Sequence, residues 1–600
     1  LEFRRVLFRS ENSMPASEIR SGGKHMKKRL FSILLTVCLV LSLAALPAFA
    51  AGEYDGKTVI LHTNDVHGSI TGYAKLAAVK ADYEAKGAKV LLVDAGDFSQ
   101  GSAYVSVSKG ADAIEMMNAV GYDFVTLGNH EFDYGAAQAQ SNLSKFTGKV
   151  LCANVFGTDG KLLYDASAIK DLGDVKVGFF GLETPEAQTK ANPALIKGLS
   201  FLAGDKMKAA AQKEVDTLKS NGADVVIGIV HLGVDASSEP NTSYDLYKAL
   251  TNVDFIIDGH SHSVMTSYGE EKLPIQSTGT AFANIGVIVI DNATKKIEKN
   301  ELLDMKKYEG GSDAAVEAEA NKIIARIDAE FGAVVAKSEV ELNGDKAPGN
   351  RTEETNLGDL ITDAMMWKIK STVELTVPEE NVVALTNGGG IRAWLHKGDL
   401  TKKDVNTVLP FGNSLAIVYV SGQQLLEALE ASTQALPESL GGFPQVAGIK
   451  FTVYTKPTYD KADTEYPGSS YFGPKTIQRV RITEVNGKPF DKNAKYAVIT
   501  NNFVAAGGDT YYAFASSTEQ LDTGILLDEV LVEYITDKLG GVVGEEYAAP
   551  LGRITIDNEN DPPKETPPTS DELSVFFWSI MALTALAGAA VCIKKKKVND

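Results

Sequence analysis

Cysteine is almost absent from this 600-residue chain, which contains only three. Cys38 and Cys592 lie in apolar segments near the two ends, so Cys152 is the single thiol of the body between them. No disulfide can form within that body, which excludes a disulfide-stapled scaffold. No internal repeat of fixed period is evident either.

Positive charge is also scarce, with 59 Lys and Arg against 78 Asp and Glu and a formal net charge of −19. Because residues 1–50 carry 8 basic and 3 acidic side chains and residues 571–600 carry 4 and 3, the body has 47 basic against 72 acidic groups, a net of −25. This balance argues against binding to nucleic acid polymers. It leaves room for a small phosphorylated ligand in a local basic pocket. The apolar share of 44% and charged share of 23% are ordinary for a globular protein.

The N-terminal residues are typical of an export signal. Residues 1–25 look like upstream vector or adapter sequence. From Met26, three basic residues, an apolar stretch and the small-residue motif ending at Ala50 follow in order, which predicts a signal peptide over 26–50.

The C-terminal residues are typical of a surface anchor. A solvated stalk is expected over 557–570, a charge-free membrane-spanning segment over 574–593, and a basic cytoplasmic tail over 594–600. Thr566–Ser570 resembles a Gram-positive sortase sorting signal, with Thr in place of Leu and Ser in place of Gly. The alternatives are cleavage by a sortase and attachment to peptidoglycan, or a plain stop-transfer helix. Either predicts a protein that is exported and anchored to the cell wall or membrane of a Gram-positive bacterium.

The body shows two patterns of secondary structure. Residues 55–310 alternate β-branched runs with helical patterns, as in an α/β domain. A linker helix is expected over 311–336, where apolar residues recur every four positions from Ile323 to Val335, and a second α+β domain over 337–556. The predicted strands of the first domain are Thr58–Leu61, Val90–Val93, Phe124–Leu127, Val175–Phe180, Val225–Val230 and Phe255–Ile257.

Polar side chains and five of the eight histidines follow these strands. Because ligands of open α/β sheets bind beyond the carboxyl ends of strands, these groups should converge. They are Asp65 and His67 after the first strand, Asp97 after the second, Asn129 and His130 after the third, His231 after the fifth, and His260 and His262 after the sixth.

Carboxylate, imidazole and amide donors together suit Zn, Mn, Fe or Co rather than Ca. Two ions about 3.5–4 Å apart need one bridging carboxylate. Asp97 is the best candidate for the bridging ligand, since it is the single acid of the Gly-Asp motif that ends the loop after the second strand. Any one of these residues alone would more often be a cap or a loop group, but the five motifs together make that explanation improbable.

The series Asp-x-His, Gly-Asp, Gly-Asn-His-Glu, His and Gly-His-x-His resembles that of calcineurin-like metallophosphoesterases. The residues within these motifs are similar to those of the secreted 5′-nucleotidase, UDP-sugar hydrolase and 2′,3′-cyclic-nucleotide phosphodiesterase family. The resemblance covers about residues 57–555. The resemblance implies a four-layer αββα metallophosphoesterase domain, a second α+β substrate-binding domain and two divalent metal ions, Zn, Mn or similar. One ion would be held by Asp65, His67, Asp97 and His262, and the other by Asp97, Asn129, His231 and His260.

The resemblance also implies that His130 is catalytic. It would stabilise the charge of the phosphoryl group or protonate the leaving oxygen, and Asp133 would orient it. The nucleophile would be a water activated by the cations. The alternative for Asp133 is an acid near a helix N-terminus.

The second domain has polar loops that suit a nucleotide. Asn387 and Arg392 flank a glycine triplet, and an Arg fork suits phosphate or carboxylate. Phe411 and Phe503 lie in Gly- and Asn-rich loops, where they could stack on a base or, alternatively, pack inward as anchors. The family resemblance implies substrate-binding roles for Arg351, Asn387, Arg392, Phe411, Phe503 and Asp509, with arginines on phosphate or terminal groups, the Phe rings on the base and Asp509 on the ribose hydroxyls.

The sequence therefore predicts an extracellular, metal-dependent phosphoric ester hydrolase that removes the 5′-phosphate from a nucleotide substrate. A 2′,3′-cyclic-nucleotide phosphodiesterase/3′-nucleotidase and a UDP-sugar hydrolase remain alternatives. A cell-surface adhesin that keeps the fold without catalysis is the non-enzymatic alternative. The sequence does not indicate an oligomeric state.

Overall fold

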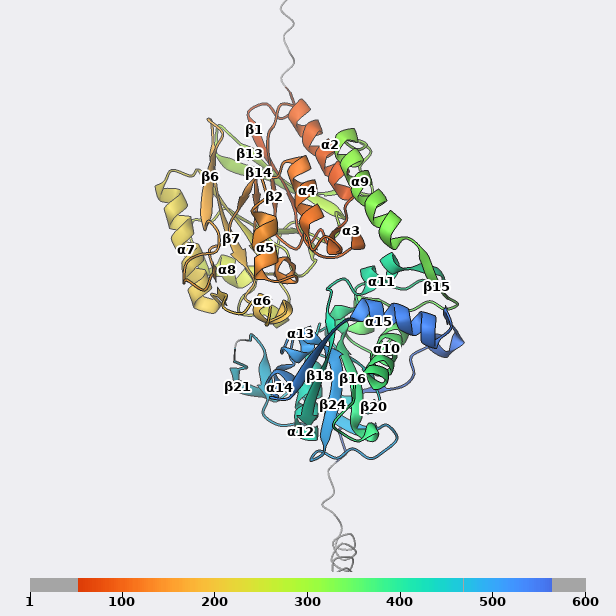
Figure 1. Ribbon diagram of the computed structural model, residues 1–600. Coiled ribbons are helices and arrows are strands. Elements are labelled where there is room, and N and C mark those ends of the chain that lie inside the picture. Colours follow the sequence, from red (N-terminus) through yellow and green to blue (C-terminus); the bar gives the residue numbers. More distant parts are fainter. Residues whose placement is uncertain (1–51, 468, 564–600) are drawn as a thin grey trace, which may run out of the picture. The chain divides into compact units, whose positions relative to one another are not determined.

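Two six-stranded sheets form the centre of the first half of the molecule (Figure 1). The computed structural model describes residues 52–467 and 469–563, and from Tyr54 onward these belong to one compact unit. The first sheet has the order β14 (Lys296–Asp304), β13 (Asn284–Asp291), β1 (Lys57–Thr63), β2 (Lys89–Asp94), β3 (Phe124–Val125) and β4 (Lys149–Val150). The second has the order β11 (Val264–Met265), β12 (Ile275–Thr278), β10 (Phe255–Ile257), β9 (Val225–His231), β7 (Lys176–Glu183) and β6 (Ser167–Asp171).

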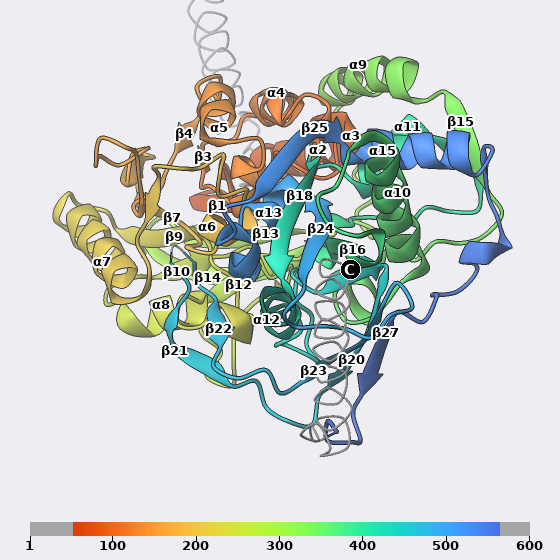
Figure 2. The same cartoon turned by 60° about the horizontal axis from the view of Figure 1, so that its bottom comes forward.

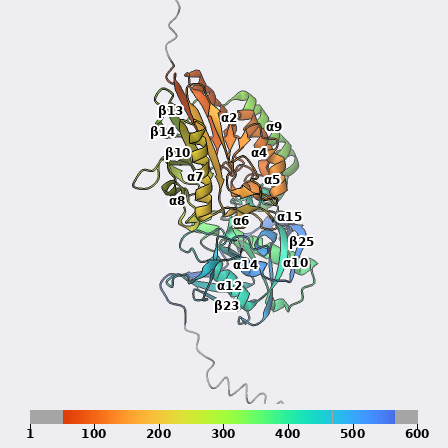
Figure 3. The same ribbon diagram turned by 90° about the vertical axis from the view of Figure 1, so that its left-hand side faces the viewer.

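Apolar side chains hold the two sheets face to face. Ile60 and Leu91 from the first sheet share one buried core with Phe179 and Ile227 from the second. Helices cover the outer faces: α2 (Gly72–Ala85), α4 (Ala111–Val120), α5 (Ala136–Leu143) and α9 (Ala314–Phe331) on the first sheet, and α7 (Gly204–Ser220) and α8 (Ser243–Ala249) on the second. Figure 3 shows α4 and α9 on one side of the strands and α7 and α8 on the other. The predicted four-layer αββα arrangement is confirmed.

All six strands predicted for this half are present. β1, β2 and β3 run parallel to one another, as do β7, β9 and β10. Their β-branched runs are buried on both faces, as expected of parallel strands covered on each side. Parallel pairing also brings the carboxyl ends of each set to the same edge of its sheet.

The linker helix ends earlier than the sequence predicted. α9 begins after Asp313, whose side chain accepts hydrogen bonds from the first-turn N–H groups, and stops at Gly332. The next residues form β15 (Val334–Ser338), which pairs with β17 (Gly398–Thr401). The prediction of helix through residue 336 was therefore wrong. The four-residue spacing of apolar side chains includes Val335 by coincidence, because the strand that follows the helix begins with two β-branched valines, Val334 and Val335.

The second half is built around a five-stranded mixed sheet. Its order is β19 (Pro444–Ala447), β16 (Val382–Asn387), β24 (Lys495–Asn501), β18 (Ser414–Ser421) and β25 (Gln520–Leu526). Alternate residues of its strands face opposite cores, so that Ala384 packs with α10 (Asn356–Thr372) and α15 (Leu527–Glu533) while Val383 packs with α12 (Gly422–Ser432). Figure 2 shows β18, β24 and β16 side by side. The second domain is α+β, as predicted.

The predicted export and anchor segments lie outside the described residues. These are the signal peptide at 26–50, the sortase-like motif at 566–570, the membrane-spanning segment at 574–593 and the basic tail at 594–600. Over 52–467 and 469–563, no helix combines the length and apolar character needed to cross a bilayer.

Candidate active site

Loops beyond the carboxyl ends of β1, β2, β9 and β10 bring most of the predicted metal ligands together. Three groups of ligating atoms have all their members within 4.8 Å of one another. They are Asp65 with His67 and His262, Asp65 with Asp97 and His231, and His67 with Asp97 and His130. The first group lies within one predicted ligand set. The second contains Asp97 and His231 of the other set together with Asp65 of the first.

Distances between these atoms suit donors that share an ion. The Nε2 atom of His67 lies 3.1 Å from Nε2 of His262, which lies 3.3 Å from Oδ1 of Asp65. The Nε2 atom of His231 lies 3.1 Å from Oδ2 of Asp97. Two ligands on one tetrahedral ion with bonds of about 2.1 Å are about 3.4 Å apart. The spacing of all three pairs therefore fits ligands of a divalent cation.

Two predicted ligands have buried atoms without a hydrogen-bond partner. These atoms are Oδ1 of Asn129 and Nε2 of His231. Leaving a buried polar atom unsatisfied costs about 1–3 kcal/mol. The other ring nitrogen of His231, Nδ1, is 2.7 Å from the Ala95 carbonyl oxygen, which fixes the ring so that Nε2 faces Asp97. Both orphaned atoms are those that a cation would satisfy, so the residues present fit the divalent ions implied by the donor set.

The charges of the cluster keep its carboxylates ionised. Burial alone would raise the pKa of Asp65, but the neighbouring His262 and His231 lower it to about 2. In the same way, His231 and His130 outweigh burial and hold the pKa of Asp97 well below its ordinary value. Ionised oxygens are what a hard or borderline cation requires.

Backbone strain is concentrated in the same loops. Thirteen non-glycine residues of the described chain have positive φ, and five of them are predicted ligands: Asp65, His67, Asp97, His260 and His262. Such conformations cost about 1–3 kcal/mol each and persist only where the surroundings impose them. Their coincidence with the ligand set indicates that the fold holds these loops in place for a function.

Glu131 is one of the groups that impose the loop shape, and no role was predicted for it from the sequence. Its carboxylate accepts four backbone N–H bonds: from Asp97 at 2.8 Å, Phe98 at 3.0 Å, Ser99 at 3.0 Å and Gly128 at 2.6 Å. Burial and the Asp97 charge raise its pKa to about 7. Glu131 therefore ties the loop after β2 to the loop after β3. The sequence signal that could have identified Glu131 is its position in the Gly-Asn-His-Glu motif.

The predicted catalytic pair is in contact. His130 lies in the 3₁₀ turn η1 (Asn129–Phe132), and its Nδ1 is 2.6 Å from Oδ2 of Asp133. Residues three apart are superposed along such a turn, which explains the pairing. Burial lowers the pKa of His130 to about 3, and burial and the Asp97 charge raise that of Asp133 well above its usual range. Both shifts disfavour charge inside the buried pair.

His260 is the one predicted histidine ligand outside the three groups. Its Nε2 is 2.8 Å from Oε2 of Glu186, so Nδ1 is the nitrogen left for a cation. Although burial works the other way, the hydrogen bond to His260 and the charge of Lys190 lower the pKa of Glu186 to about 2. Glu186 was not predicted as a site residue from the sequence, although it comes only three residues after the end of β7.

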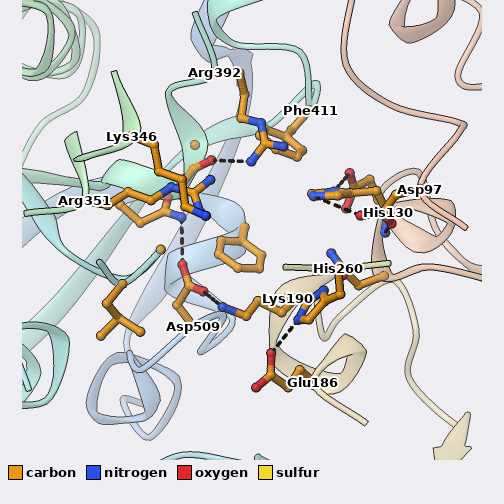
Figure 4. A pocket seen from close by; sticks show the side chains of 18 of the residues that line it. Asp97, His130, Glu186, Lys190, His260, Lys346, Arg351, Arg392, Phe411 and Asp509 are labelled. Atoms are coloured by element: carbon orange, nitrogen blue, oxygen red, sulfur yellow. Dashed lines mark hydrogen bonds and ion pairs between the residues drawn. The ribbon is translucent and has the colours of Figure 1, made fainter. Parts of the chain in front are cut away.

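One cavity joins this cluster to the predicted substrate residues (Figure 4). From the cluster, its walls include Asp97, Asn129, His130, Asp133, His260 and His262. From the second half they include Arg351, Asn387, Arg392, Phe411, Phe503 and Asp509, which is every residue predicted to bind substrate. Asp65, His67 and His231 are the predicted residues that do not line it.

The aromatic residues of the cavity are held by specific neighbours. The ring of Phe411 lies 5.8 Å from that of His130, and the Arg392 guanidinium lies 5.6 Å from the Phe411 ring centroid. Phe503 packs over Gly508, where a Cβ atom would come within 2.4 Å of the ring. Gly508 is therefore required for Phe503 to lie where it does.

The glycine triplet is explained by a close approach of chain segments. A Cβ atom on Gly388 would lie 1.8 Å from the carbonyl oxygen of Asn350, next to Arg351. The Nη1 atom of Arg392 donates only a long, 3.5 Å hydrogen bond, to Gly389. The triplet thus brings the two arginine-bearing segments together at the cavity.

The cavity carries more positive charge than the sequence predicted. Lys346 lines it, and burial together with Arg351 lowers the Lys346 pKa to about 8. Burial, followed by the Arg392 charge, lowers the pKa of Arg351 to about 10. Among the described residues, neither Lys346 Nζ nor the Arg351 guanidinium has a hydrogen-bond or ion-pair partner. An anion is the ligand that such a cluster favours.

Comparison with known proteins agrees with this geometry. Residues 58–264 match the family described as calcineurin-like phosphoesterase, and residues 334–516 match the 5′-nucleotidase C-terminal domain. The trifunctional nucleotide phosphoesterase protein YfkN of Bacillus subtilis is 29% identical over 543 residues, which are 83% of this chain. The chain spans only 35% of that relative's length.

Two further relatives match over nearly their whole length. Snake venom 5′-nucleotidase of Crotalus adamanteus is 28% identical over 580 residues, covering 87% of this chain and 92% of its own. The solved structure of a 5′-nucleotidase precursor from Thermus thermophilus superposes with a TM-score of 0.69 at 28% identity, covering 84% of this chain and 100% of that one. The chain therefore belongs to the calcineurin-like metallophosphoesterases that carry a 5′-nucleotidase C-terminal domain, and it is a hydrolase of phosphoric esters.

Proposed function

We propose that this protein is an extracellular two-metal phosphohydrolase that removes the 5′-phosphate from nucleotides, leaving nucleoside and phosphate. The observation that carries the proposal is the shared cavity, in which His130 and Asp97 face the same space as Phe411, Phe503 and Asp509. A generic phosphatase needs the first two residues but has no use for paired aromatic rings and a buried carboxylate. The names of the relatives support a nucleotide substrate.

The residues of the chain divide the chemical work. When bound, two divalent cations supply a water of lowered pKa and positive charge opposite the phosphoryl oxygens. Arg392 and Arg351 bind the phosphate as charge-assisted donors. The phosphate charge raises the pKa of His130, which then holds a proton at Nε2 for the leaving 5′-oxygen. Asp133 keeps the imidazole oriented through Nδ1.

The nucleoside end is recognised by different contacts. Phe411 and Phe503 stack on the base, a contact worth about 1–3 kcal/mol per base. The Asp509 carboxylate accepts hydrogen bonds from the ribose hydroxyls. It is 4% exposed and is held by Asn387, whose Nδ2 donates to it at 2.9 Å.

A UDP-sugar is the second candidate substrate. The unpartnered Lys346 beside Arg351 gives the cavity a cation that a single phosphate does not need. Two linked phosphates would use it. Hydrolysis of 2′,3′-cyclic nucleotides is the remaining alternative within the family.

The test is phosphate release by the purified protein from AMP, UDP-glucose and 2′,3′-cyclic AMP, with Mn or Zn and with EDTA. We expect AMP to be the best substrate and EDTA to abolish release. If UDP-glucose or the cyclic nucleotide is preferred, the 5′-nucleotidase assignment gives way to that alternative. Absence of metal-dependent release from all three would contradict the proposed reaction.

We also propose that the protein is exported and anchored at the cell surface. The support is the order of basic, apolar and small residues over 26–50, and of the sortase-like motif, the charge-free segment and the lysines over 566–597. Mass spectrometry of the cell-wall fraction distinguishes the two anchors. Cleavage after Thr569 identifies sortase attachment, an intact C-terminus in the membrane fraction identifies a stop-transfer helix, and recovery in the cytoplasm alone contradicts export.

A further inference from the structure

Lys190 joins the two halves of the molecule at the cavity. It ends α6 (Ala187–Lys190) in the first half, and its Nζ lies 3.8 Å from Oδ1 of Asp509 in the second. The same Nζ lies 5.6 Å from the centroid of the Tyr471 ring. Figure 4 shows Lys190 between Asp509 and Glu186. Neither Lys190 nor Tyr471 was predicted as a site residue from the sequence.

Asp509 is held from both halves. Its backbone N–H donates a 2.7 Å hydrogen bond to the carbonyl oxygen of Thr189, the residue before Lys190. Its Oδ2 accepts from Asn387, and its other oxygen faces Lys190. The φ angle of Asp509 is +52°, in the left-handed region that non-glycine residues rarely adopt. A strained backbone with these contacts leaves the carboxylate little freedom to turn.

The contacts of Lys190 are electrostatically strong. The Lys190 side chain is 22% exposed and that of Asp509 is 4% exposed, so solvent screens their attraction only weakly. Although burial works the other way, the neighbouring Tyr471, Asp509 and Glu186 raise the Lys190 pKa above its ordinary value. Among the described residues, Lys190 is the cation within 4.0 Å of Asp509, so removing its ammonium would leave this buried carboxylate only the more distant charges of Arg351 and Arg392.

We propose that Lys190 is a positioning residue for ribose recognition. It holds the Asp509 carboxylate, across the boundary between the two halves, in the orientation that accepts hydrogen bonds from the ribose 2′- and 3′-hydroxyls. The inference rests on the proposed function, which gives Asp509 to the ribose. Lys190 would thus be a residue that determines ribose specificity although it belongs to the phosphoesterase half rather than to the substrate-binding half.

Lys190 also stands next to the metal-binding end of the cavity. Glu186, four residues earlier, attracts Lys190 and holds the Nε2 of His260 at 2.8 Å. The short segment 186–190 thus contacts the predicted ligand His260 at one end and the predicted ribose-binding Asp509 at the other. One short piece of chain therefore reaches both the predicted metal-binding end and the predicted ribose-binding end of the cavity.

The chain provides a matched control. Lys403 also joins the two halves: its Nζ lies 2.7 Å from Oδ1 of Asp328 and 5.3 Å from the Tyr104 ring centroid. It has the same partner types as Lys190, a carboxylate and a tyrosine ring, but it does not line the cavity. Any effect of merely loosening the boundary should appear in both lysine variants.

The experiment compares Lys190→Met, Lys190→Arg and Lys403→Met in the full chain. Calorimetry measures the Kd of adenosine and of 2′,3′-dideoxyadenosine, and kinetics measure KM and kcat for AMP and 2′,3′-dideoxy-AMP. We expect Lys190→Met to raise the adenosine Kd and the AMP KM about tenfold, the effect of one charge-assisted hydrogen bond, with kcat and the dideoxy values changed less than twofold. Lys190→Arg should recover most of the loss. Lys403→Met should change both ligands equally.

Two results would overturn the inference. One is an equal loss of adenosine and dideoxyadenosine binding in Lys190→Met, which would mean a general structural role. The other is a full tenfold loss when Lys190→Met is added to Asp509→Asn, because the lysine is inferred to act only through that aspartate.

Failure of the proposed function is separately visible. If the wild-type protein prefers adenosine to dideoxyadenosine but releases no phosphate from AMP, the reaction is wrong and the inference stands. If the wild-type protein shows no preference between the two nucleosides, Asp509 does not read the ribose and the inference falls.

Discussion

The Nδ1 atom of His130 lies 2.6 Å from Oδ2 of Asp133, whose side chain is 2% exposed, while that of His130 is 13% exposed. The contact is local, since both residues belong to one tight turn after β3. It directs the remaining nitrogen, Nε2, to within 4.0 Å of Oδ2 of Asp97, the predicted bridging ligand. A single turn therefore places the predicted proton donor beside the predicted metal centre.

Removing the Asp133 carboxylate should impair turnover more than binding. In Asp133→Asn, the imidazole loses the carboxyl group that orients it through Nδ1, so we expect kcat to fall about 10²–10⁴-fold with KM nearly unchanged. Steady-state kinetics on AMP check this. Asp159→Asn, at an exposed position, is the control. A kcat within threefold of wild type would assign Asp133 to the structural role of a helix-terminal acid.

Asp97→Ala should remove both metal and activity. One of its oxygens, Oδ2, lies 3.1 Å from Nε2 of His231 and 3.9 Å from Nε2 of His67, so both predicted ion positions lose a ligand. We expect elemental analysis to show less than one bound ion per chain where the wild type retains two, and phosphate release to fall more than 10³-fold. Two ions retained by the variant would contradict the bridging role.

Phe411→Ala should weaken nucleotide binding selectively. Loss of one stacked ring costs about 1–3 kcal/mol, which predicts a KM for AMP raised about 10–100-fold. A phosphate ester without a base, p-nitrophenyl phosphate, is the control substrate and should change less. An unchanged KM for AMP would show that Phe411 serves only as packing for His130 and Arg392.

Much of the architecture could be predicted from the sequence because strands of parallel sheets have a strong local signal. Continuous β-branched runs gave the six strands of the first half, and the polar residues directly after them, such as Asp65 and His260, marked the sheet edge where a site forms. The coarse conclusion, a metal-dependent phosphoric ester hydrolase, followed from these strand ends together with their resemblance to a known family.

The site residues that could not be predicted depend on contacts between segments far apart in the sequence, and such contacts leave no periodic pattern in it. Glu186, Lys190 and Lys346 follow no recognised motif, and each matters because of a partner about 70 to 320 residues away or because of the cavity it enters. The end of α9 was misplaced for the opposite reason. An apolar spacing of four residues at Val335 satisfies the helical pattern, although this residue lies in a strand beyond Gly332.

His62 gives a pH-dependent stability that is independent of the catalytic pair. It is fully buried in β1, its Nε2 bonds to Oε1 of Gln276 at 3.0 Å, and burial lowers its pKa to about 4. In the unfolded chain the value returns to about 6.5. Between these two values the unfolded chain binds more protons than the folded one, so the free energy of unfolding falls as the pH falls from 6.5 to 4. The total loss due to His62 is about 3 kcal/mol.

His62→Gln should therefore flatten the acid side of the stability profile. Urea unfolding at pH 7 and pH 4.5, in EDTA so that release of metal does not contribute, measures the difference between the two pH values. The variant is less stable at pH 7, because glutamine fills the site less well, but it should lose about 2–3 kcal/mol less on acidification than the wild type. His396→Gln is the control, since that imidazole is 75% exposed and has no burial to relieve. An equal loss in His62→Gln and wild type would mean that the acid sensitivity arises elsewhere. His67 and His130, which are largely buried and whose pKa values are also lowered, would be the next residues to replace.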